Sequence, residues 1–174
     1  MSLDKTKLKN NLIEWMNAPS NNIEDTAEAF ANAYDGYALD AQDISGDSPL
    51  VLNKSAILAA FKTLTTIDTA QTAAIKIENG LVLYWTGGLF NLLIPPLGTI
   101  PPEISAIVTA PIIPPAISTG LGTIFLNIDK EYSTEDRASD MADLLDTATK
   151  LVIVTCIGTL VAPPFSLAVL GPIS

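Results

Sequence analysis

Acidic side chains are the residues whose types and spacing come nearest to a chemical site in this sequence. Asp35, Asp40, Asp43 and Asp47 crowd one region, and the run from Asp43 to Asp47 resembles the start of a calcium-binding loop. The run lacks the regular ligand spacing of such a loop, and no bidentate glutamate closes it. We therefore expect a turn here and no calcium site.

A second acidic group, Asp136, Asp140 and Asp143, has spacings of four and three residues, which place the three carboxylates on one face of a helix. A solvated helix face is the ordinary outcome of this pattern, and a cation site is the alternative. Glu103 is the only charged residue between Asn79 and Ile128. We interpret it as part of a solvent-facing turn after two prolines; a buried ion-pair partner or a catalytic acid are the alternatives.

Other kinds of catalytic or cofactor site lack their essential residues. The chain has no histidine, which excludes Ser–His and Cys–His nucleophiles and histidine metal sites. Its one cysteine, Cys156, lies in an apolar run and cannot form an intrachain disulfide, so we expect a buried thiol. The glycine-rich runs 85–88 and 118–123 lack the Gly-Lys-Ser/Thr of a phosphate-binding loop and the third glycine of a dinucleotide fingerprint. We predict no enzyme, no cofactor and no metal.

The net charge limits the classes of partner that this chain can bind. Aspartate and glutamate number 19 against 9 lysines and arginines, a formal net charge of -10, and there is only one arginine, Arg137. Nucleic-acid binding requires a basic face, so we expect no nucleic-acid partner. The N-terminus shows no charged segment followed by an apolar one, so no signal peptide is predicted and synthesis in the cytoplasm is expected.

The first half of the sequence predicts four helices from apolar residues spaced three and four apart. Asp4 is the expected cap of the first, which runs to about Asn17. The second carries acids in its first turn, where they complement the helix dipole. Asn53 is the expected cap of the third helix, and Asp68 that of the fourth, which runs to about Trp85.

Proline changes the pattern in the middle of the chain. Ten of the twelve prolines follow residue 90, including four Pro-Pro pairs, and proline removes backbone donors and favours extended geometry. We expect extended segments here, with short strands at 106–108 and 123–126. A final helix should open at Ser133 with an imperfect capping box to Asp136, present an apolar face as far as Thr155, and stop at Pro163.

These elements predict a single domain over residues 1–174. It comprises a helical part (1–86), a Pro-rich apolar extended segment (87–128), and a C-terminal helix with an apolar tail (129–174). The predicted class is mainly α, with a helical N-terminal half, one long C-terminal helix and a minor β segment. An α+β fold is the alternative.

Charged residues are almost missing from two long stretches. Residues 79–128 hold only Glu103, and residues 151–174 hold no charged side chain. A membrane-spanning helix needs about 20 unbroken apolar residues, and glycine or proline interrupts both stretches sooner. We therefore expect contact with other protein subunits, as a homo- or hetero-oligomer. A membrane-associated or lysis-type protein, a monomeric apolar bundle and an unrecognised acid–base enzyme are the alternatives. The expected interface residues are Trp85, Leu93, Ile94, Ile112, Ile113, Phe125, Phe165 and Leu167.

The order of segments resembles small virion structural proteins of tailed, T4-like phages. The residues that carry this resemblance are the run 30–38, the run 83–87, the apolar middle with Pro114-Pro115, and the Gly171-Pro172-Ile173 ending. The resemblance implies an accessory part of a phage head, neck, tail or baseplate, made in the host cytoplasm and assembled into the virion. It transfers no catalytic residue.

Overall fold

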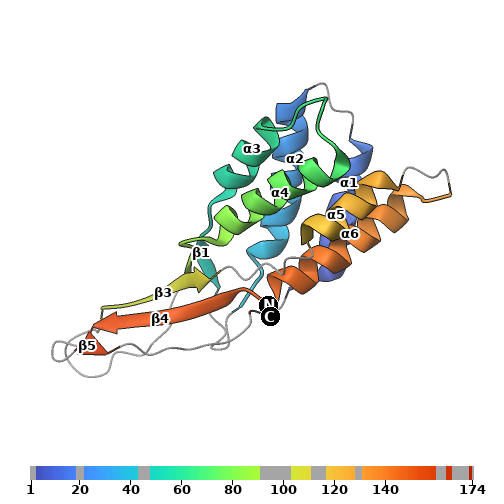
Figure 1. Ribbon diagram of the computed structural model, residues 1–174. Helices are drawn as coiled ribbons and strands as arrows, with labels where there is room; N and C mark the ends of the chain where they lie inside the picture. Colours follow the sequence, from blue (N-terminus) through green and yellow to red (C-terminus); the bar gives the residue numbers. More distant parts are fainter. Residues whose placement is uncertain are drawn as a thin grey trace.

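The computed structural model describes residues 3–18, 22–42, 48–90, 103–110, 117–127, 131–159, 164–165 and 173. Within them the chain is mainly helical with a small antiparallel sheet, which confirms the predicted fold class (Figure 1). The helices are α1 (Lys5–Asn17), α2 (Ile23–Ala38), α3 (Lys54–Lys62), α4 (Ala70–Trp85), α5 (Ile117–Leu126) and α6 (Thr134–Thr149). The strands are β1 (Pro49–Val51), β2 (Leu89–Phe90), β3 (Glu103–Ala110), β4 (Ile153–Thr159) and β5 (Pro164–Phe165).

All four predicted N-terminal helices are present, and side-chain caps begin most of them. The Asp4 carboxylate accepts hydrogen bonds from the amides of Thr6 and Lys7, as predicted. The fourth helix starts one residue later than expected, because Thr69 caps it while the Asp68 carboxylate accepts from Lys76 and Thr65 instead. Asn53 occupies the cap position of α3 but makes no side-chain cap hydrogen bond.

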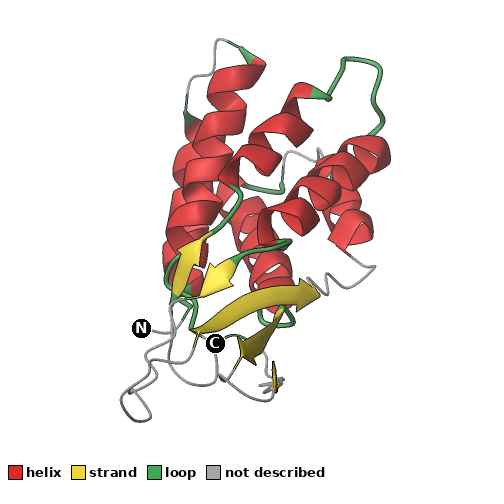
Figure 2. Cartoon of the chain, turned by 90° about the vertical axis from the view of Figure 1, so that its left-hand side faces the viewer, coloured by secondary structure: helices red, strands yellow, loops and turns green. Residues whose placement is uncertain are grey.

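Each helix packs on the next one along the chain, and α6 packs back on α1. The six helices therefore form a closed circuit around one core (Figure 2). Every helix contributes to the same buried cluster, for example Leu12, Phe30, Ile57, Leu121 and Leu145. Burying a side chain of this size contributes about 1.5–3 kcal/mol, so this shared core is the main source of stability.

Helix α5 corrects one prediction. Residues 123–126 were expected to form a strand, yet they end a helix that begins at Ile117. No proline lies between Pro115 and Pro163, so nothing interrupts the helix, and the Glu78 carboxylate accepts a 2.6 Å hydrogen bond from the Ser118 amide in its first turn. Packing against α4 and α6 outweighs the strand preference of these residues.

Helix α6 begins as predicted but ends earlier. Ser133 and Asp136 form the reciprocal capping box, with the Asp136 amide donating to Ser133 Oγ at 3.1 Å and the Ser133 amide to Asp136 Oδ2 at 3.2 Å. The helix was expected to continue until Pro163, but it stops at Thr149 and β4 follows. The β-branched residues Val152 to Thr155 suit a strand, and pairing with β3 satisfies their backbone.

The strands form one antiparallel sheet in the order β1-β2-β3-β4-β5. The predicted short strand at 106–108 lies within β3 and is confirmed. Strands β3 and β4 form the longest pair, in register from Glu103 opposite Thr159 to Val108 opposite Val154, with a shift before Ala110 opposite Ile153. We call β3, β4 and β5 the β-arm, because they extend away from the helices in Figure 1.

The capping box of α6 yields a stability prediction. Ser133→Ala removes the oxygen that accepts from the Asp136 amide, so the free energy of unfolding should fall by about 1 kcal/mol in urea denaturation. Ser133→Thr keeps a cap oxygen and should lose much less. An unchanged midpoint for Ser133→Ala would count against the cap as a stabilising contact.

Two helical glycines provide a matched test of the packing. A Cβ on Gly80 in α4 would lie 2.6 Å from Ala60 Cβ, whereas one on Gly36 in α2 would meet only Asn11 Nδ2, at 3.8 Å. Gly36→Ala should therefore raise the free energy of unfolding by about 0.5–1 kcal/mol through helix propensity. Gly80→Ala should lower it by about 1–3 kcal/mol, because α3 and α4 must move apart. Equal effects in thermal and urea melts would contradict the close approach.

Candidate functional site

The acidic groups singled out in the sequence do not converge. Asp143 pairs with Lys5 of α1, and Asp140 accepts a hydrogen bond from the Tyr132 hydroxyl. The Ser133 hydrogen bonds hold the pKa of Asp136 below its usual range. No cluster of three His, Cys, Asp or Glu side chains able to hold a metal lies among the residues described, and Asp43 and Asp47 fall outside them.

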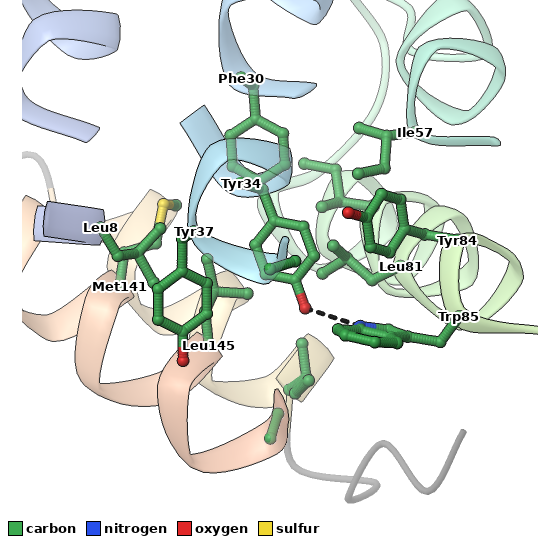
Figure 3. Packing of buried hydrophobic residues seen from close by; sticks show 14 of the residues in the cluster. Leu8, Phe30, Tyr34, Tyr37, Ile57, Leu81, Tyr84, Trp85, Met141 and Leu145 are labelled. Carbon is green, nitrogen blue, oxygen red and sulfur yellow. Dashed lines mark hydrogen bonds between the residues drawn. The ribbon is translucent and has the colours of Figure 1, made fainter. Parts of the chain in front are cut away.

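A buried hydrogen-bond network connects α2, α4 and α6 at the centre of the bundle. The Trp85 indole N–H donates to the Tyr34 hydroxyl at 2.9 Å (Figure 3), and Tyr34 shares a 2.7 Å hydrogen bond with the Thr149 hydroxyl. All three side chains are almost completely buried. Burial raises the pKa of Tyr34 to about 12, although its hydrogen bonds with Thr149 and Trp85 partly offset that rise.

Two further tyrosines donate to carboxylates at the edges of this network. The Tyr37 hydroxyl donates to Asp146 Oδ1 at 2.7 Å, and Lys150 donates to the other carboxylate oxygen at 2.8 Å. The Tyr84 hydroxyl donates to Asp35 Oδ1 at 2.8 Å. Burial, reinforced by the adjacent carboxylate, raises the pKa of both tyrosines well above its ordinary value. The neutral phenols are therefore fixed as donors.

The network lies where the chain leaves the helices for the sheet. Trp85 is the last residue of α4, and β2 begins four residues later. The intervening turn uses Gly87 at a φ of 73°, a left-handed conformation that glycine adopts readily and the kind of turn expected from this glycine pair. Thr149 is the last residue of α6, and β4 begins four residues later. The same hydrogen bonds thus fix both points from which the sheet starts.

The sheet brings together the two stretches of the sequence that are almost without charge. Strands β2 and β3 come from residues 79–128, and β4 and β5 come from residues 151–174. Glu103 is the only charged residue in any of the five strands, and it lies at the first position of β3. The β-arm is therefore an almost uncharged projection from a strongly acidic helical bundle.

Parts of both stretches belong to the internal core. Trp85, one of the expected interface residues, is fully buried within its own chain and leaves no surface for another subunit. Phe125 is partly buried against the same core, and Val152, Val154 and Ile173 are buried too. Phe165 lies in β5. The other expected interface residues, Leu93, Ile94, Ile112, Ile113 and Leu167, lie outside the described part of the chain.

A second apolar surface was missed in the sequence. The α3–α4 groove, of about 290 Å³, is lined mainly by Ala56, Ala59, Ala60, Gly80 and Leu83. The leucine is 54% exposed, and exposed apolar residues of β1 and β2 continue from this end of the helices: Leu50 (64%), Val51 (53%) and Leu89 (36%). The helical spacing predicted an inward face for α3 and α4 but gave no signal for an outward one.

Among the residues described, no helix is long and apolar enough to cross a membrane. This finding is compatible with the expectation that the apolar stretches do not cross a membrane as helices.

Comparison with known proteins adds no relative. No protein-family model matches the chain, no curated protein is significantly similar to it, and no solved structure matches it significantly. A function for this chain must therefore be inferred from its own residues and geometry.

The buried tyrosines predict a loss of stability at high pH. The pKa of Tyr34 rises from 10.0 to about 12 on folding, so between these values the phenol ionises only in the unfolded chain. Its contribution is fully present below pH 10 and should fall by about 1.4 kcal/mol per pH unit above it. Denaturant melts across this range, read beside tyrosinate absorbance, measure the effect. Ionisation of all four tyrosines near pH 10 in a chain that stays folded would contradict the network.

Proposed function

We propose that this protein is a non-catalytic structural subunit of a larger protein assembly, and that the β-arm contacts a neighbouring subunit. The observation that carries the proposal is the pairing of β3 with β4, which joins two stretches that together hold one charged residue, Glu103, in an otherwise highly charged chain.

The charge pattern supports a protein partner. Burying an unpaired charge in a subunit interface costs several kcal/mol, so a surface that is covered by protein is selected to lack charges. The helical bundle needs no such selection, because its charges face solvent or pair between helices, as Lys9 does with Glu135 and Lys62 with Glu24. The β-arm has one charged residue in three strands.

A phage virion is the assembly that the segment order favours, with this chain as an accessory protein of the head, neck, tail or baseplate. Production in the host cytoplasm followed by incorporation into the particle is part of this proposal. A membrane-associated or lysis-type protein is the competing function, since an uncharged projection also suits a lipid surface.

Acidic substitutions in β3 test the contact. Neighbouring positions in a strand face opposite sides of a sheet, so Ile107→Asp and Val108→Asp sample both faces of the β-arm. At least one should change the free energy of unfolding by less than about 1 kcal/mol while weakening the binding of an apolar fluorescent dye, because it alters a surface that only a partner covers. Thr66→Asp, at an exposed turn position, is the control and should change neither quantity.

Two results would overturn this function. If both variants lose several kcal/mol of stability, β3 is internal core on both faces and offers no contact surface. If the wild-type chain floats with phosphatidylcholine or mixed anionic vesicles in a density gradient, the membrane-associated alternative replaces the assembly subunit.

A further inference from the structure

The α3–α4 groove is a consequence of close helix packing. Gly80 lies against Ala60 so tightly that a Cβ there would approach the alanine methyl to 2.6 Å. Small residues at this crossing bring the two helices together but leave their outer seam unfilled. The seam remains as an open, apolar hollow on the surface, with Leu83 at its rim.

The helices that form the groove connect directly to the sheet. Strand β1 ends shortly before α3, β2 follows α4, and the Asn53 amide donates to the Tyr84 carbonyl at 3.0 Å where these segments meet. Val51 of β1 lies directly opposite Leu89 of β2, so the two exposed side chains share one face. From there the sheet continues through β2 into the β-arm.

Charge distinguishes this face from the rest of the molecule. Residues 49–90 carry three lysines and two acids, a net charge of +1, so the remainder of the chain carries -11. The one charged residue lining the groove, Lys76, is neutralised by Asp68, with Nζ 2.7 Å from Oδ2, and also donates to the Thr63 carbonyl. The lysines of α3 pair with acids of α2, Lys54 with Asp35 and Lys62 with Glu24.

The near-neutral charge of the groove determines which partner it can bind. A strongly basic protein would be drawn to the acidic faces of α2 and α6, and the neutral groove gives it no specific attraction. The groove instead suits an apolar surface with almost no charge. The β-arm of this chain matches that composition, because its three strands carry one charged residue, Glu103, and a second acidic copy can bring it to this face without opposing acid to acid.

We infer that the α3–α4 groove, with Leu50, Val51 and Leu89 at its margin, receives the β-arm of a second copy of this chain. The inference rests on the proposed function and names the partner. In a twofold arrangement, each copy's β-arm would occupy the other's groove. The dimer then has two equivalent contacts.

The solution mass of the full-length chain tests this pairing. Light scattering over a concentration series should give the mass of two chains for the wild type, where one chain is 18.4 kDa. Leu83→Glu places a charge in the groove at a side chain that is 54% exposed, so the fold should persist while the dimer dissociates at least tenfold more readily. Ile67→Glu is the matched control: it makes the same kind of change at an 89% exposed residue outside the groove lining and should stay dimeric.

Three results would overturn the inference. A wild-type chain that stays monomeric at every concentration excludes a second copy as the occupant, while the β3 variants and the vesicle flotation still judge the proposed function separately. A Leu83→Glu dimer as stable as the wild type excludes the groove. A dimer that Leu83→Glu breaks but that neither Ile107→Asp nor Val108→Asp weakens excludes the β-arm. Circular dichroism and thermal melts identify any variant that has lost its helices.

Discussion

The hydrogen bonds from Trp85 to Tyr34 and between Tyr34 and Thr149 tie together three helices that are far apart in the sequence. Their groups lie in the core, where an unpaired donor or acceptor costs about 1–3 kcal/mol. A shift of α2 would break both bonds and a shift of α4 or α6 would break one, so they select one register for these three helices. Apolar contacts alone tolerate several registers, because they have no direction.

That register has consequences beyond the core. Trp85 and Thr149 end the helices that lead into β2 and β4, so a constraint on their side chains is also a constraint on where the sheet begins. The pairing of β3 with β4 then depends on chain segments that leave the bundle at fixed points. Close packing also constrains these helices. Because Gly120 has no side chain, α5 can approach α6 closely; a Cβ at this position would come within 2.8 Å of Leu144.

The sequence correctly predicted features that depend on interactions between residues close together in the chain. The caps at Asp4 and Ser133 and the apolar faces of α1 to α4 depend on residues within a few positions of each other, and the structure confirms them. The errors concern contacts between distant residues. Glu78 stabilises the start of α5 from 40 positions away, and pairing with β3 places residues 153–159 in a strand where a helix was expected. Neither partner is visible in a local window. The absence of charge, which predicted a contact with other subunits, could not identify residues such as Trp85 that are buried in the chain's own core.

Electrostatics and packing together limit how such a chain can associate. With a net charge of -10, most approaches between two copies oppose acid to acid, and salt screens this repulsion only beyond about 8–10 Å. Surfaces in direct contact are closer than that, so they must be neutral or paired. The α3–α4 groove and the β-arm meet this requirement by different routes, the groove through the ion pair of Lys76 with Asp68 and the β-arm by having almost no charge. The repulsion that prevents other encounters therefore contributes to specificity, because it leaves few orientations in which two copies of this chain can meet.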